Sequence, residues 1–232
     1  MTSIHVLSGG AAQGLVTQLQ DSFKAQTQHE VDATFGAVGM MKDSFLAGTP
    51  CDVIILTKAL VAELIASGDL LAGSSQALGV VLTGVAVKTG EKAPDVRSPE
   101  ALKAALRAAK GIYFPDPIKA TAGIHVMRVL KELGLDVELA DRLRPYPNGA
   151  TAMKAMAEAQ QSGLIGCTQI TEILNTAGVE LIAPLPKAFE LATTYTAAVT
   201  TRSTQPQAAS ELIKLLVSPQ AAARRLACGF EA

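Results

Sequence analysis

The spacing of apolar residues changes period twice within the first forty positions. Ile4–Leu7 is a short apolar run. Val16, Leu19 and Phe23 then recur at helical spacing, and apolar and polar residues alternate over 31–35. Alternation over two residues is typical of a strand, and recurrence over three or four residues is typical of a helix. This order predicts a strand, a small-residue loop, a helix and a second strand.

The same succession continues along the chain. The further predicted strands cover 53–56, 80–87, 111–114, 164–167 and 191–201. The further predicted helices are one opened by 36–39, then 60–65, 98–110, 124–134, 153–159, 170–175 and a last one starting at Ser218. Ser98 and Ser218 each precede a proline, which is typical of a capped helix start. Strands that alternate with helices predict an α/β fold whose mixed sheets are flanked by helices on both faces.

Two long β-rich stretches, 80–87 and 191–200, bracket the middle third of the chain. We interpret both as strands that cross between two lobes. Lobe one would comprise 1–81 and 197–232, lobe two would comprise 82–196, and a ligand cleft would lie between them. Closure about this hinge would bury the ligand.

Composition excludes several classes of function. Hydrophobic residues make up 49% and charged residues 18%, which is typical of a packed globular protein. The net charge is −1 and no basic stripe with interleaved aromatics is present, so we expect no nucleic-acid partner. Cys51, Cys167 and Cys228 are widely spaced, and we expect neither a disulfide framework nor a metal site. No nucleotide-binding or hydrolase motif occurs, and we expect no cofactor.

The sequence carries no export signal and no apolar run of the ~18 residues that cross a bilayer. We therefore expect a protein that does not span the membrane. Two explanations fit this N-terminus equally well. The protein is cytosolic, or it is a mature exported protein whose signal was replaced by an initiator Met.

Three turns made of small residues precede predicted helices: 8–11, 36–40 and 121–123. Small residues let the backbone approach a ligand closely, and the start of a helix presents N–H groups and a partial positive charge. These turns are therefore candidates for binding an anion.

The motifs in their order resemble those of type 2 periplasmic solute-binding proteins, and more narrowly the molybdate-binding proteins of ABC transporters. The carrying segments are 6–12, 35–39 with 47–53, 116–124 and 218–230. The resemblance implies a two-lobed fold with two crossover strands, a periplasmic monomer, a small anionic ligand and an ABC transporter permease as partner. It also implies a set of ligand-binding residues. These are Ser8, Gly10, Ala11, Ala37, Gly39, Met40, Lys119, Thr121, Ala122, Gly123, Ala150, Gln169 and Tyr195.

The departures from the family pattern bear on the ligand. Molybdate-binding proteins carry serine hydroxyls in the second turn, where this chain has Ala37-Val38-Gly39. Their pocket tyrosine corresponds to Gln169. Lys119 and His125 add positive or protonatable groups beside the third turn, which favours an organic di- or tricarboxylate over a tetrahedral oxyanion.

The same family resemblance includes aconitate isomerases, which gives an enzymatic alternative. Moving a proton across an allylic system needs a base and a cation that stabilises the dienolate. If the protein is an isomerase, Lys119 and His125 are the candidate catalytic residues. Plainer interpretations stay open: a structural His125, a solvated Lys119, and a Tyr195 that packs in the hinge. A cytosolic anion sensor is a third hypothesis for the whole chain.

Overall fold

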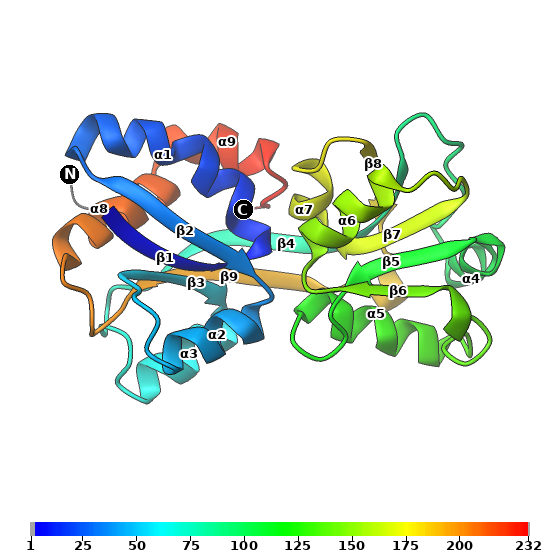
Figure 1. The fold of residues 1–232 in the computed structure, drawn as a ribbon, viewed down its shortest axis with the longest axis horizontal. Helices are drawn as coiled ribbons and strands as arrows, with labels where there is room; N and C mark the ends of the chain where they lie inside the picture. The colour runs from blue at the N-terminus through cyan, green and yellow to red at the C-terminus, as the bar shows by residue number, and fades with distance from the viewer. Residues whose placement is uncertain (1–2, 232) are drawn as a thin grey trace. The chain divides into compact units, whose positions relative to one another are not determined.

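The computed structural model describes residues 3–231 and divides the chain into two compact units. Unit 1 contains the chain through Val81 and from Thr193 onward, and unit 2 contains Leu82–Ala192. Figure 1 shows the consequence in colour, because the blue N-terminal and the orange to red C-terminal segments belong to the same unit. The chain leaves unit 1 within one strand and returns at the start of another.

Unit 1 is built on the parallel strands β1, β2 and β3. Their order is β2-β1-β3, and β9 pairs with β3 in the antiparallel direction. The strands are β1 (Ser3–Gly9), β2 (Glu30–Gly36), β3 (Val53–Thr57) and β9 (Ala192–Val199), followed along the chain by the helices α1 (Gln13–Thr27), α2 (Val38–Leu46), α3 (Lys58–Ala66), α8 (Pro206–Val217) and α9 (Ala222–Ala227). Short 3₁₀ turns at Gly10–Ala12 and Pro219–Ala221 precede α1 and α9.

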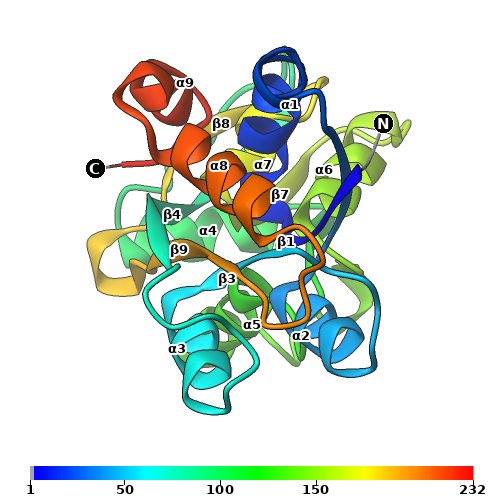
Figure 2. The ribbon, with the colours of Figure 1, turned by 90° about the vertical axis from the view of Figure 1, so that its left-hand side faces the viewer.

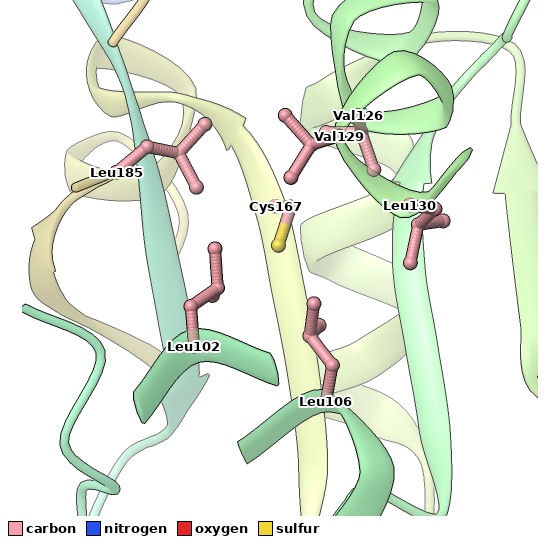
Figure 3. A pocket seen from close by; sticks show the side chains of 7 residues that line it. All are labelled: Leu102, Leu106, Val126, Val129, Leu130, Cys167 and Leu185. Atoms are coloured by element: carbon pink, nitrogen blue, oxygen red, sulfur yellow. The ribbon is translucent and has the colours of Figure 1, made fainter. Parts of the chain in front are cut away.

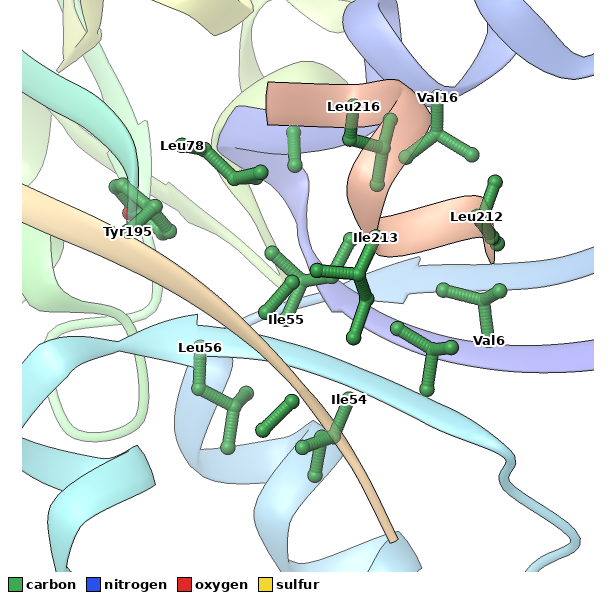
Figure 4. Packing of buried hydrophobic residues seen from close by; sticks show 14 of the residues in the cluster. Val6, Val16, Ile54, Ile55, Leu56, Leu78, Tyr195, Leu212, Ile213 and Leu216 are labelled. Carbon is green, nitrogen blue, oxygen red and sulfur yellow. The ribbon is translucent and has the colours of Figure 1, made fainter. Parts of the chain in front are cut away.

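Helices cover both faces of the unit 1 sheet. Figure 2 shows α1 and α8 on one face and α2 and α3 on the other. Ile54 and Ile55 of β3 are completely buried because each face of this strand meets a helical layer. Figure 4 shows Ile55 packed below Ile213 and Leu216 of α8. Helix α8, from the C-terminal part of the chain, therefore supplies part of the core around the N-terminal strands.

Unit 2 has the parallel strands β5, β6 and β7, and β4 pairs in the antiparallel direction with both β7 and β8. The order is β8-β4-β7-β5-β6. The strands are β4 (Gln76–Lys88), which begins in unit 1, β5 (Gly111–Pro115), β6 (Leu143–Tyr146), β7 (Leu164–Gln169) and β8 (Val179–Pro184), with the helices α4 (Pro99–Ala108), α5 (Thr121–Glu132), α6 (Gly149–Glu158) and α7 (Ile170–Leu174) and 3₁₀ turns at Ala140–Arg142 and Lys187–Phe189.

Two apolar layers hold unit 2 together. On one face, side chains of α4 and α5 pack around Cys167 of β7 and leave a cavity of about 10 Å³, shown in Figure 3. This volume is about the smallest that holds one water, and the lining is apolar. On the other face, Met153 and Met156 of α6 pack so closely on Gly166 that an added Cβ would lie 2.6 Å from the Met153 Cε.

The predicted α/β fold with mixed sheets and flanking helices is confirmed. Ser98 caps α4 as predicted, accepting the Ala101 N–H at 3.1 Å, but α4 ends at Ala108. The predicted helix at Ser218 is a 3₁₀ turn followed by the short α9. We did not predict β6, β8 or α8 from the sequence.

Candidate functional site

The carboxyl ends of the three parallel strands of unit 1 lie at one edge of its sheet. Gly9 at the end of β1 is in register with Gly36 at the end of β2, and Ser8 is in register with Ile55 of β3. Ligands of open α/β sheets bind beyond the carboxyl ends of the strands. Two of the predicted turns follow these ends directly, so the structure brings them to the same edge.

The first turn packs tightly against its neighbours. A Cβ at Gly9 would lie 2.7 Å from Val38 Cγ1 and 3.1 Å from Tyr195 Cε1, so only glycine fits. Ser8 is completely buried and its hydroxyl donates to the Gly9 carbonyl at 2.9 Å. Gly10 and Ala11 form the 3₁₀ turn that leads into α1, and no side chain caps it. Its first backbone N–H groups are thus not taken by a side chain.

The second turn has the same character. Ala37 is the N-cap of α2, in an extended conformation and with no side-chain hydrogen bond to the helix start. Ala37 is buried, Gly39 is half-buried and Met40 is 40% exposed. Tyr195 of β9 is in register with Thr57 at the end of β3, which places this buried residue at the same edge. The unit 1 residues predicted from the sequence therefore form one group.

In unit 2, α5 follows the carboxyl end of β5 and also starts without a side-chain cap. A Cβ at Gly123 would lie 2.2 Å from the Asp116 carbonyl oxygen and 2.3 Å from that of Pro115, so the first turn of α5 lies directly on the end of β5. Ala122 is buried and Thr121 is half-buried. This third turn therefore matches the two in unit 1.

The two candidate catalytic residues lie in different surroundings. Lys119 is exposed in the loop before α5, and its backbone N–H donates to Asp116 Oδ1 at 2.8 Å. His125 is 4% exposed, and its Nε2 donates to the Phe189 carbonyl oxygen at 2.7 Å. Burial lowers the pKa of the His125 ring, and the hydrogen bond to Phe189 opposes this shift. This geometry gives the imidazole a role within the packing of unit 2.

The start of α6 holds a buried carboxyl group of the protein itself. Glu172 is 6% exposed, and its Oε2 accepts the Thr168 hydroxyl proton at 2.5 Å. The backbone N–H groups of Ala150, Gly149 and Gln169 also bond to this carboxyl group. Burial raises the pKa of Glu172, and these hydrogen bonds partly oppose the rise. The Ala150 N–H, predicted to bind ligand, thus has a partner within unit 2.

Asn148 completes the capping of α6 by accepting the Thr151 N–H at 2.9 Å. The starts of α3 and α4 are likewise capped by Thr57 and Ser98. The starts of α1, α2 and α5, at the three predicted turns, lack a side-chain cap, and so do those of α7, α8 and α9. What α1, α2 and α5 share is a turn of small residues after the carboxyl end of a parallel strand.

Gln169 lies at the end of β7 and is 2% exposed. Neither its Nε2 nor its Oε1 has a hydrogen-bond partner. The Thr83 hydroxyl on β4, in register with Gln169, and the Thr171 hydroxyl are also buried without a partner. An unpaired buried polar group costs about 1–3 kcal/mol. Such a cluster is therefore typical of a place that receives a polar ligand group.

The residues at these helix starts can bind an anion through backbone N–H groups. Among the described residues, no lysine or arginine is buried, so a buried anion would depend on helix starts and neutral polar side chains. No cluster of three or more potential metal-ligating residues occurs within 3–231. Burial raises the pKa of the Cys167 thiol to about 12, which is the behaviour of a structural cysteine.

Sequence reasoning missed Glu172 and Thr83. The spacing of Thr168 and Glu172, four residues apart after a predicted strand, is a weak signal for the first. Nothing in the local sequence marks Thr83, because its position opposite Gln169 arises from pairing with a strand far along the chain.

None of the helices described is long and apolar enough to cross a membrane.

A family model described as bacterial extracellular solute-binding protein matches residues 4–231. The match covers nearly the whole chain. The chain belongs to the bacterial extracellular solute-binding proteins. The predicted resemblance to type 2 solute-binding proteins is thereby confirmed.

Known proteins similar to this solute-binding protein differ in their stated function. An aconitate isomerase of Pseudomonas sp is 26% identical over 231 residues, covering 96% of this chain and 85% of the relative. The periplasmic molybdate-binding protein of Azotobacter vinelandii is 20% identical with a TM-score of 0.79, covering 99% of each chain. A sulfate-binding protein of Mycobacterium tuberculosis is 16% identical with a TM-score of 0.78, covering 99% of this chain and 86% of the other. These structural likenesses establish the fold.

Proposed function

We propose that this solute-binding protein binds a small organic anion, a di- or tricarboxylate, and delivers it to the permease of an ABC transporter from the periplasm. The observation that carries the proposal is the set of uncapped helix starts at α1, α2 and α5, each following the carboxyl end of a parallel strand. Such starts offer backbone N–H groups and partial positive charge to an anion.

The side chains at these starts favour an organic anion. Ala37 and Gly39 bring no hydroxyl to the second turn, where molybdate-binding proteins carry serines. Gln169 offers an amide with both a donor and an acceptor. Lys119 adds an exposed cation beside α5, which suits a ligand with a second carboxylate.

Thermal shift and calorimetry on the purified protein test the class of ligand. We expect citrate, tricarballylate, malate or succinate to raise the melting temperature, because a ligand that binds only the folded state stabilises it. Molybdate and sulfate are the comparison anions. Stabilisation by molybdate alone would overturn the assignment to organic acids.

A substitution at Thr121 tests the role of the α5 start. Ala120 before it is extended, so Thr121→Pro fits the first helical position and removes only one N–H and the hydroxyl. Thr121→Ala is the matched control, because it keeps the N–H and removes the hydroxyl. We expect Thr121→Pro to weaken carboxylate binding by roughly 10-fold or more, and Thr121→Ala to do so much less. Equal affinities for both variants would contradict the proposed N–H contact.

An aconitate isomerase is the second candidate, favoured by the similarity of the Pseudomonas enzyme. Incubation with cis-aconitate, followed by NMR, detects conversion to the trans isomer. If conversion occurs, Lys119→Met should lower turnover, whereas Lys131→Met, on the exposed side of α5, should not. His125→Gln separates catalysis from packing, since glutamine keeps a donor for the Phe189 carbonyl. No conversion at high protein concentration would remove this candidate.

A further inference from the structure

Two buried residues of unit 2 form an uncharged polar pair that no ion pair or hydrogen bond in the structure explains. Thr83 on β4 and Gln169 on β7 are directly opposite in an antiparallel pair, so their side chains leave the sheet on the same face. Thr83 is 1% exposed and Gln169 is 2% exposed. The Thr83 hydroxyl and both polar atoms of the Gln169 amide have no partner, and so the two side chains do not bond to each other.

The backbone around this pair is fixed on both sides. The Thr83 N–H donates to the Leu191 carbonyl at 3.1 Å, and the Thr83 carbonyl accepts the Leu185 N–H at 3.0 Å. The Gln169 N–H bonds to the Glu172 carboxyl group. A Cβ at Gly84 would lie 2.8 Å from Ile170 Cγ1, so β4 packs closely on the first residue of α7. The unpaired side chains therefore do not result from a loose loop.

We propose that Thr83 and Gln169 form a subsite that binds a hydroxyl group of the ligand. The subsite rests on the proposed function and narrows it to hydroxylated organic anions. Thr171, whose hydroxyl is also buried without a partner two residues beyond Gln169, is the third polar group of this region.

The hydrogen-bonding capacities favour a hydroxyl over a carboxylate. The amide of Gln169 needs both an acceptor and a donor, whichever way its oxygen and nitrogen are assigned. An ionised carboxylate only accepts, and would leave the amide oxygen unpaired. A hydroxyl both donates and accepts, so it can satisfy the amide oxygen and still accept from the amide nitrogen or from Thr83.

Charge in this region supports the same choice. The carboxyl group of Glu172 accepts a hydrogen bond from the backbone N–H of Gln169. When Glu172 is ionised, its negative charge therefore lies beside the subsite. A second anionic group at Gln169 would be repelled in this buried setting. A neutral hydroxyl carries no such penalty.

Matched ligand pairs test the proposal. Citrate differs from tricarballylate, and malate from succinate, by one hydroxyl group. Calorimetry with wild-type protein should give a preference for the hydroxylated member of about 100-fold, because a site that pairs with a hydroxyl discriminates strongly against its absence. Thr83→Val and Gln169→Leu should each reduce this preference to a few-fold, because neither variant keeps both groups that pair with the hydroxyl.

Thr176→Val is the control, because the Thr176 hydroxyl is paired, donating to the Glu172 backbone carbonyl at 2.7 Å. It should leave the preference unchanged. Circular dichroism and the melting temperature of each site variant without ligand show whether it is folded. Equal wild-type affinities within both pairs, or a preference that both site variants retain, would overturn the subsite alone. Failure of wild-type protein to bind any of the four acids would overturn the proposed function, and the subsite with it.

Discussion

Glu172 is a carboxyl group buried at a helix start, and this residue makes stability depend on pH in an unusual direction. Burial raises its pKa in the folded protein above the usual value of 4.5. The folded state therefore holds this proton more tightly than the unfolded state. The stabilisation is complete below pH 4.5 and is lost as pH rises through the folded pKa.

We predict that Glu172→Gln removes this pH-dependent contribution to the unfolding free energy. The unfolding free energy of the variant should rise relative to wild type as pH increases above 4.5, because glutamine does not ionise. Urea unfolding of both proteins at a series of pH values measures the difference. A difference that is constant with pH would show that the Glu172 pKa does not change on folding.

His125 makes the stability of the folded protein depend on pH in the opposite direction. Burial lowers the pKa of its ring below 6.5, so the unfolded state binds the proton more tightly. Its contribution is complete above pH 6.5 and is lost as pH falls through the folded pKa. We predict that His125→Gln makes the protein less sensitive to acid over this window. Melting temperatures of both proteins between pH 7 and pH 5 provide the check, and parallel curves would contradict the prediction.

Gly149 leaves less room for a Cβ than the other glycines described in unit 2. A Cβ there would lie 1.9 Å from Glu172 Oε2 and 2.0 Å from Thr168 Oγ1. We predict that Gly149→Ala lowers the unfolding free energy by roughly 1–3 kcal/mol through overpacking. Gly111→Ala is the control, since its nearest atom, Leu164 Cδ2, is 3.1 Å away and can move. Similar effects of the two changes on urea unfolding would refute the role of the Glu172 contact.

At the scale of elements, side-chain caps stabilise the starts of α3, α4 and α6. The Ser98 hydroxyl accepts the Ala101 N–H and stabilises α4. We predict that Ser98→Ala lowers the unfolding free energy by about 1 kcal/mol, and that Ser98→Asp keeps most of it. Ligand affinity should not change in either variant. Thermal unfolding and calorimetry test the two halves of this prediction separately.

Local patterns predicted the central strands and the edge strand β2, but not β6 and β8 of unit 2. The short, fully apolar run 53–56 is typical of a buried strand, and it forms β3 between two helical layers. β6 (Leu143–Tyr146) contains Arg144 and Pro145, and its place in the sheet depends on pairing with β5. β8 likewise depends on pairing with β4. For α8 a local signal is present in the sequence, because Leu212 and Leu216 recur at helical spacing.

The same distinction applies to the site. Small residues before a helix are visible in a sequence, so the turns at Ser8, Ala37 and Thr121 were predictable. The pairing of Thr83 with Gln169 was not, because the two lie far apart along the chain and meet through strand register. The partner of the Ala150 N–H was hidden for the same reason, since Glu172 reaches it from another helix.

At the scale of the whole molecule, unit 2 is a continuous segment and unit 1 is not. Unit 2 has its own apolar layers on both faces of its sheet. We predict that a fragment spanning 82–192 folds cooperatively, and that a fragment spanning 1–81 does not, because it lacks β9 and α8. Circular dichroism during urea titration distinguishes the two outcomes, and a cooperative transition in the shorter fragment would contradict the prediction.

The antiparallel pairing of β3 with β9 sets the order of events during synthesis. Thr57 pairs with Tyr195, so the apolar edge of β3 leaves the ribosome long before its partner strand exists. Until then it is an exposed strand edge of the kind that pairs with other chains. The edge of β3 therefore stays unpaired during synthesis until residues 192–199 have been added to the growing chain.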